Sequence, residues 1–455
     1  MAFWIYDVGF LILFSIFIAV FLYLNRHKIK REGILFLYRT RWGINSIKKF
    51  SDKYSRILKA LKYVVILIGF ILTAGILYIL GQAAYIYIAY PQITKIISAP
   101  PIAPLIPYFP KLFGLESFFP DFYFTYFLIA LAIVAIVHEF SHGIFMKLFK
   151  IRIKSTGFVF LGPILGAFVE QDDKQMKKKK KSEQMAVLGA GTFANLIFAG
   201  IFFLLLLAFF YISFSPSGFI FNTYAYSILP ASLISDRQEV GNLTEIYADG
   251  QIFYLDAKLK EQLNKNLTNI IAYDDTPAFH AGLAGIILEI DGEKIRNRND
   301  LIIFLGKKSP GDIVQIKTLY NEKERFFTIK LSEHPVSQKA YIGIVSIPRQ
   351  TRGIAGKFLA FFSFKNESTY YETKADGNLI YFIYNLLWWI MVINFLVALF
   401  NMLPLGILDG GRFFYLGILS LTKSEKFAKK SFKFISFLII FLFLTIIFLW
   451  LFNII

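Results

Sequence analysis

Cysteine is absent from the 455-residue chain, and charged residues are scarce. Without cysteine the protein forms neither disulfides nor thiol-based active sites, and its redox compartment cannot be read from the sequence. Asp, Glu, Lys and Arg together make up only 18% of the residues, whereas 56% are hydrophobic. A single soluble core could not bury so much apolar side chain. This balance places the chain among membrane proteins.

Six apolar runs are long enough to cross the hydrocarbon core of a bilayer as helices. They lie at residues 10–24, 63–88, 123–149, 185–212, 379–403 and 432–452. No basic residue precedes the first run, and several follow it directly. This pattern favours a membrane anchor with its N-terminus outside over a cleaved signal peptide.

Acidic residues are fewer than basic ones, at 31 against 49. The Lys and Arg residues lie between the apolar runs: twelve in 26–62, nine in 150–181 and five in 412–430, but only two in 91–121. With alternating crossings the three rich segments share one side, which the positive-inside rule assigns to the cytoplasm. Both chain ends are then expected outside. Nucleic acid is not expected as a partner, because a nucleic-acid-binding protein would carry its basic residues on a solvated face.

The composition changes to that of an ordinary globular domain between the fourth and fifth runs. We therefore expect a polytopic α-helical membrane protein of about six transmembrane helices with an inserted small α+β domain. The expected parts are two N-terminal helices with a basic cytoplasmic loop, the first part of a membrane core, an extracytoplasmic insert, and the second part of the core with a final helix. They cover residues 1–90, 91–213, 214–376 and 377–455, respectively.

Short strands and turns with one helix are expected within the insert. A helix is predicted at 298–305, and two alternating runs at 313–320 and 325–331 predict a hairpin across 321–324. The order of these elements over residues 240–348 resembles a PDZ domain of the protease-associated kind. That resemblance implies that an extended peptide pairs with an exposed strand edge. The alternative is a small sheet domain that only caps the membrane portion.

The sequence His138-Glu139-Phe140-Ser141-His142 lies near the cytoplasmic end of the third run. On a helix, histidines four residues apart share one face, so both imidazoles can bind one Zn²⁺, with Glu139 beside it as a general base. The chain has five histidines, and only these two lie within an apolar run. Ionisable side chains at membrane depth are costly and usually mark function. The alternative is a polar pair that joins helices.

A catalytic zinc of this kind needs a third protein ligand and an open position for water. Asp409 is the candidate, because it follows the fifth run and the topology places it at the same cytoplasmic end as the histidines. It belongs to the segment Asn401-Met402-Leu403-Pro404-Leu405-Gly406-Ile407-Leu408-Asp409-Gly410-Gly411. Read alone, Asp-Gly-Gly would be a turn, and Pro404 would break a helix.

The two motifs together resemble the site-2 protease family of intramembrane zinc metalloproteases. The resemblance also covers the loop Gly166-Ala167-Phe168-Val169-Glu170 and the Gly-x-x-x-Asn element from Gly191 to Asn195. It implies a three-helix catalytic core in which His138, His142 and Asp409 bind one zinc and Glu139 is the catalytic acid and base. The implied substrates are membrane-spanning segments of other proteins in the lipid bilayer, cleaved in regulated intramembrane proteolysis. We expect Asn195, or else Asn401, to bind the oxyanion or the substrate backbone.

Two other functions fit parts of the pattern. A transporter would show inverted repeats and charged residues dispersed over several spans near the midplane, and neither is seen. A catalytically inactive protein that binds membrane clients through the insert would tend to have lost a zinc ligand or Glu139. All four residues are present.

Overall fold

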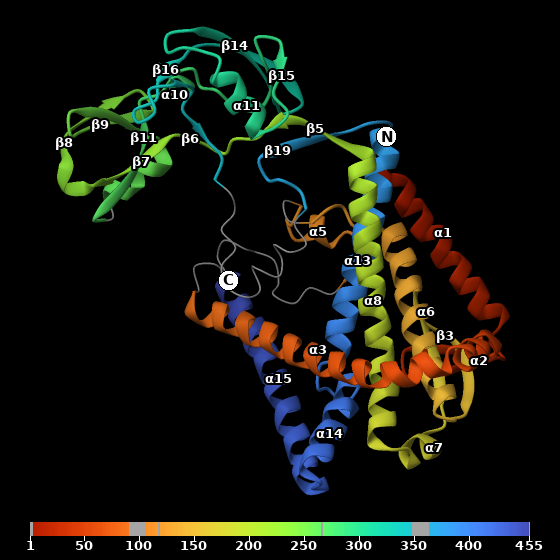
Figure 1. The fold of residues 1–455 in the computed structure, drawn as a ribbon. Helices are drawn as coiled ribbons and strands as arrows, with labels where there is room; N and C mark the ends of the chain where they lie inside the picture. Colours follow the sequence, from red (N-terminus) through yellow and green to blue (C-terminus); the bar gives the residue numbers. More distant parts are fainter. Residues whose placement is uncertain (1–2, 91–104, 117–118, 265–266, 348–363, 455) are drawn as a thin grey trace. The chain divides into compact units, whose positions relative to one another are not determined.

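The computed structural model describes residues 3–90, 105–116, 119–264, 267–347 and 364–454 of the chain (Figure 1). The chain forms two compact units. The membrane unit comprises Met1–Phe210 and Asn378–Ile455, and the insert comprises Tyr211–Gly377. The ends of the insert lie close to the range 214–376 expected from composition.

Six helices in the described part of the chain are long and apolar enough to cross a membrane. They are α1 Phe3–Leu24, α3 Ser55–Ala89, α6 Phe124–Leu148, α8 Lys181–Ser213, α13 Gly377–Asn401 and α15 Glu425–Ile454. Each contains most of one predicted run. Helices α1, α3 and α15 begin well before their runs because an apolar run measures the length that crosses lipid, whereas helical hydrogen bonding continues through polar residues.

The main core of the membrane unit joins α3, α6, α8, α13 and the shorter helix α14 Asp409–Thr422. Helix α14 approaches α3 closely, because a Cβ at Gly69 would lie only 2.6 Å from the ring of Phe413. Two polar contacts fix α14 against α8. Arg412 donates to Oε1 of Gln184 at 2.9 Å, and Lys181 donates to the carbonyl of Leu419 at 3.1 Å.

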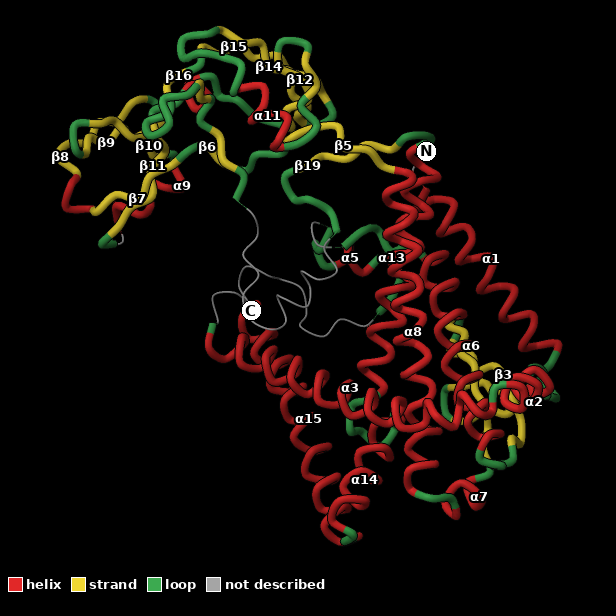
Figure 2. The backbone as a smooth tube through the Cα atoms, viewed as in Figure 1, coloured by secondary structure: helices red, strands yellow, loops and turns green. Residues whose placement is uncertain are grey.

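A four-stranded antiparallel sheet also belongs to the membrane unit, in the order β1-β2-β3-β4 (Figure 2 draws its strands in yellow). Its strands are β1 Ile29–Glu32, β2 Leu35–Thr40, β3 Ile153–Leu161 and β4 Ile164–Gln171. Strand β4 is the last in this order, pairs with β3 and packs along α6. Residues 26–62 were predicted only to be a basic loop, but they form β1, β2 and the helix α2 Ile44–Lys53.

The N-terminus of α6 is capped by a residue from another helix. Tyr123 precedes α6 and its side chain makes no cap. Instead, the buried carboxylate of Asp7 in α1 accepts the backbone N–H groups of Phe124 at 2.7 Å and Thr125 at 2.9 Å. It also accepts the hydroxyls of Thr125 at 2.6 Å and Tyr108 at 2.5 Å. A carboxylate here satisfies unpaired helix donors and complements the positive end of the helix dipole.

We expect Asp7→Ala to destabilise the membrane unit by about 1.5–3 kcal/mol, the range for hydrogen bonds to a charged group. The measurement is thermal unfolding of the purified protein in detergent. Asp121→Ala is the matched control, since the exposed Asp121 carboxylate accepts only the Tyr123 hydroxyl among the described residues. Equal unfolding temperatures for the two variants would show that Asp7 does not cap α6.

The described part of the insert contains two large sheets with separate cores, together with two pairs of very short strands. The first has the order β7-β11-β10-β9-β8 and consists of β7 Tyr226–Pro230, β8 Ile234–Val240, β9 Leu243–Ala248, β10 Gln251–Leu255 and β11 Asn269–Asp274. The second has the order β15-β14-β12-β5-β19, with β13 Glu293–Lys294 paired beside β12. Its other strands are β5 Phe214–Phe219, β12 Ile286–Ile290, β14 Ile313–Tyr320, β15 Lys323–Lys330 and β19 Thr369–Thr373. The range 240–348 expected for a PDZ-like domain therefore extends over both sheets.

The local predictions for the second sheet agree closely with the structure. Helix α11 covers Arg298–Leu305, and β14 and β15 form the expected hairpin. Its turn is shorter than the four residues predicted, because Lys323 already pairs with Tyr320. Asn321 and Glu322 make the turn with φ of 48° and 62°. Two central residues with positive φ match the twist of the flanking strands.

Candidate active site

Helix α6 presents His138 and His142 side by side. Both imidazoles are buried, with 7% of each residue exposed. Their Nε2 atoms are 3.0 Å apart. The four-residue spacing on one helix thus places both rings on the face that the sequence predicted.

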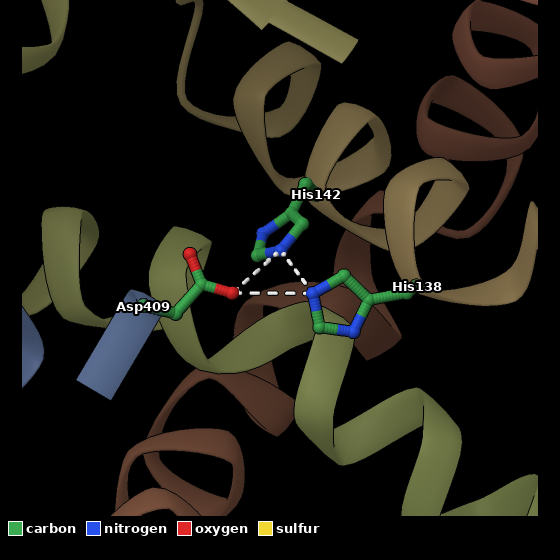
Figure 3. A group of neighbouring side chains, drawn as sticks. All are labelled: His138, His142 and Asp409. Carbon is green, nitrogen blue, oxygen red and sulfur yellow. Dashed lines mark hydrogen bonds and ion pairs between the residues drawn. The ribbon is translucent and has the colours of Figure 1, made fainter. Parts of the chain in front are cut away.

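Asp409 reaches the same point from the first turn of α14. Helix α13 ends at Asn401, and the chain turns through Pro404 before α14 begins. The two glycines after Asp409 are required by packing, since a Cβ at Gly410 would collide with the backbone of Met402 and one at Gly411 with the carbonyl of Leu405. This tight turn brings Oδ2 of Asp409 to 3.1 Å from Nε2 of each histidine. Figure 3 shows the three side chains pointing toward one another.

The three atoms form a triangle with sides of 3.0 to 3.1 Å. Two ligands at tetrahedral angles around zinc, with bonds of 2.0–2.2 Å, are about 3.3–3.6 Å apart, so the triangle is close to the required size. Two imidazole nitrogens and one carboxylate oxygen are also suitable donors for a transition metal. These residues could therefore bind one metal ion.

Helix α8 contacts the far side of both imidazoles. Nδ1 of His142 lies 2.6 Å from the carbonyl oxygen of Val187, which can only accept. Nδ1 of His138 lies 3.1 Å from the side-chain amide of Asn195. Gly191 lies between these two contacts, and a Cβ there would be 2.6 Å from atoms of both rings. Both Nδ1 atoms thus contact α8, and both Nε2 atoms lie beside Asp409.

Glu139 lies beside the cluster. Its Oε2 accepts the backbone N–H of Val169 in β4 at 2.9 Å. Glu139, His142 and Asp409 line one cavity of about 330 Å³, whose other walls include the polar residues Lys154, Glu170, Gln171 and Asp173. Glu139 and two of the three cluster residues therefore face one cavity that has space for water.

The sheet wall of this cavity carries a fixed negative charge. The hydroxyl of Ser155 donates to Oε2 of Glu170 at 2.7 Å, and Arg39 of β2 forms an ion pair with the same oxygen at 3.1 Å. The hydrogen bond from Ser155, and then the contact with Arg39, lower the pKa of the Glu170 carboxyl. Glu170 therefore stays ionised and ties the N-terminal hairpin to β4.

A second cavity borders Glu139 and is mainly apolar. It runs between α6 and β4, and its aromatic walls are Trp42, Phe140, Phe158 and Phe168. Trp42 precedes α2 and lies in the N-terminal segment, whose strands were not predicted from the sequence.

One residue in that segment indicates its hairpin. Gly33 separates the two short strands β1 and β2 and adopts φ of 62° in the turn between them.

The six residues singled out from the sequence occupy different positions. His138, His142 and Asp409 form the cluster, and Glu139 lines the cavity beside it. Asn195 is fully buried behind His138 and does not line that cavity. Asn401 is half-buried at the end of α13, and no hydrogen bond among the described residues joins it to the cluster. Val187 was missed because it acts through a backbone carbonyl, which has no sequence signature.

Comparisons with known proteins identify the family. Residues 126–447 match the model of peptidase family M50. The chain is 28% identical over 284 residues to an uncharacterized protein of Methanocaldococcus jannaschii, covering 62% of the chain and 54% of the relative. It is 39% identical over 67 residues to a probable periplasmic DegP-like serine endoprotease of Halomonas elongata, covering 14% of each. The chain thus spans about half, or less, of the length of these relatives.

The family match covers more than half of the chain and contains His138, His142 and Asp409. The six long apolar helices are those of a protein that crosses the membrane repeatedly. The chain is therefore a multi-pass membrane protein that belongs to peptidase family M50.

Proposed function

We propose that the protein is an intramembrane zinc metalloendopeptidase that cleaves the transmembrane segments of membrane-anchored proteins. One observation carries the proposal: two members of the ligand cluster, His142 and Asp409, line the same cavity of the membrane unit as Glu139. Two of the ligands and Glu139 come from α6, a helix long enough to span lipid. Polar groups at such depth are expensive unless they serve a function.

Zinc is the metal that the donor set favours. Catalytic zinc sites combine three protein ligands with an open position, and two histidines with one carboxylate are such a set. When bound, zinc would lower the pKa of a water molecule and polarise the scissile carbonyl. His138, His142 and Asp409 would hold it.

Glu139 moves the proton in the proposed reaction. It accepts a proton from the attacking water and delivers it to the leaving amine of the cleaved peptide. The hydrogen bond from Val169 to Oε2 orients the carboxylate toward the cavity. The other carboxylate oxygen, Oε1, remains available for the proton transfers.

Strand β4 would receive the unwound substrate. A helical substrate must expose its amides before cleavage, and exposed amides need partners at membrane depth. The Val169 N–H points away from β3, toward Glu139. Backbone groups alternate along a strand, so Ala167 and Leu165 share this outward edge. An extended substrate beside β4 would place its side chains in the aromatic cavity next to Glu139.

The orientation we propose places the active site near the cytoplasmic face and the insert outside. Helix α2 packs against α6 next to Gly143, and the loop before α8 follows α6 in sequence; both are rich in basic residues and support this orientation. We also propose that the PDZ-like part of the insert binds an extended peptide at a strand edge. Among the described strands of its larger sheet, β15 and β19 are the outermost in the strand order, whereas β12 is flanked by β14 and β5.

The experiment that tests this function maps the position of the cut. Purified protein in lipid vesicles is incubated with a panel of single-span substrates, and the products are identified by mass spectrometry. We expect cleavage within the apolar span, and none with Asp409→Ala. Cuts confined to soluble loops, or equal cleavage by Asp409→Ala, would contradict the proposal.

A further inference from the structure

We infer that Asn195 is a positioning residue that holds the His138 ring by accepting a hydrogen bond from its Nδ1–H. This inference rests on the proposed metal site and assigns Asn195 a role other than contact with the substrate. The side chain of Asn195 is fully buried, lies 3.1 Å from Nδ1 of His138, and does not line the cavity that contains Glu139.

The spacing along α8 explains how one helix serves both imidazoles. Val187, Gly191 and Asn195 are four residues apart, so they form one stripe on the helix surface. The carbonyl of Val187 accepts from His142, and the side chain of Asn195 faces His138. Gly191 leaves room for both rings between these contacts. The stripe on α8 therefore matches the histidine pair on α6 position by position.

The protonation of His138 fixes the direction of the hydrogen bond. Its Nε2 atom faces Asp409 at 3.1 Å and His142 at 3.0 Å, which is where a metal ligand must offer a lone pair. A neutral imidazole with a free Nε2 carries its hydrogen on Nδ1. Nδ1 is therefore a donor and needs an acceptor on α8.

The amide of Asn195 can supply this acceptor. With the Nδ2 atom toward His138, two donors would face each other, and the buried Oδ1 of Asn195 has no partner among the described residues. A half-turn of the terminal amide exchanges the two atoms, and the hydrogen-bond network decides between the two orientations. The half-turn pairs Nδ1–H of His138 with Oδ1 and removes the unpaired buried oxygen. Both observations thus point to the same orientation.

A hydrogen bond of this kind has a defined effect on a metal ligand. It fixes the tautomer, holds the ring in the plane that the metal needs, and makes the ligating nitrogen more basic. Loss of such a partner typically weakens metal binding by about 10- to 100-fold. Asn195 therefore acts through His138 on the affinity and geometry of the site.

The test compares three variants of the full-length protein. Asn195→Leu keeps the size but removes the acceptor, and Asn195→Asp keeps both. Asn394→Leu is the matched control, since Asn394 is an equally buried asparagine in α13 whose Nδ2 donates to the carbonyl of Ile390. Zinc and cobalt affinities are measured by competition with a chelator, and the absorption spectrum of the cobalt form reports ligand geometry.

We expect Asn195→Leu to bind both metals about 10- to 100-fold more weakly and to shift the cobalt spectrum. Asn195→Asp should retain the affinity of the wild type, and Asn394→Leu should match it in affinity and spectrum. Unchanged affinity in Asn195→Leu would overturn the inference. If that variant fails to fold, a tenfold loss in Asn195→Asp would overturn it instead. Failure of the wild type itself to bind either metal would refute the proposed function, which is a separate result.

Discussion

Glu139→Gln should bind metal as the wild type does and yet fail to hydrolyse peptide bonds. Glutamine has the shape of glutamate, and its side-chain oxygen can still accept the N–H of Val169. It cannot take a proton from water at neutral pH. Because general acid–base catalysis contributes about 10²- to 10⁴-fold, we expect a loss of that size in kcat. The same preparation is assayed for zinc content and for cleavage of a single-span substrate.

The control for this variant is Glu425→Gln. Glu425 is exposed at the start of α15, where it pairs with Lys429 at 2.8 Å, and its loss should leave cleavage unchanged. If Glu139→Gln retained more than about a tenth of the activity, far above the range expected for a lost general base, Glu139 would not be the proton carrier. If it lost metal as well, Glu139 would have to be counted among the groups that hold the ion.

Gly191→Ala should weaken metal binding strongly although it adds only one methyl group. The new Cβ would lie 2.6 Å from Cε1 of His138 and 2.6 Å from Nε2 of His142, so at least one ring must move. Overpacking of a closely packed site costs about 1–3 kcal/mol. If this cost falls on the liganded state, metal affinity decreases by about 5- to 150-fold. Chelator competition measures the loss.

Gly200→Ala is the matched control on the same helix. A Cβ at Gly200 meets no described atom within 4 Å, so this variant should bind metal as the wild type does. Equal metal affinity in Gly191→Ala and Gly200→Ala would contradict this prediction, because it would show that the two histidine rings can move away from α8 without loss of metal binding. Thermal unfolding of both variants separates a shift of the rings from a general loss of stability.

The parts that sequence predicts well are those in which physics restricts the residue types. Lipid accepts only long apolar helices, so the six spans are visible in the chain. The pair His138 and His142 is recognisable because two ligands on one helix require a fixed spacing. Asp409 could be identified only because the alternating membrane crossings place the segment after the fifth span on the same side of the membrane as the histidines.

The parts that sequence did not predict depend on contacts between distant residues. Asp7 caps α6 across 117 residues of sequence, and nothing local to Asp7 indicates its partner. Strands β1 and β2 are only four and six residues long and lie in a segment rich in basic residues, so neither their hairpin nor the pairing of β2 with β3 was predicted. The first sheet of the insert was not predicted, because the elements that resemble a PDZ domain all follow residue 275. Asn195 was predicted to bind the oxyanion or the substrate backbone, whereas its contact with His138 depends on the packing of α8 against α6.

The most direct test is the zinc content of the purified wild type beside that of Asp409→Ala. Both proteins are stripped of metal, exposed to the same free zinc, and analysed for metal and protein. We predict one zinc per wild-type chain, the stoichiometry of a site with three protein ligands, and at most about a tenth as much in Asp409→Ala. A wild type that remains free of zinc, or an Asp409→Ala variant that binds as much as the wild type, would show that His138, His142 and Asp409 do not form the catalytic metal site.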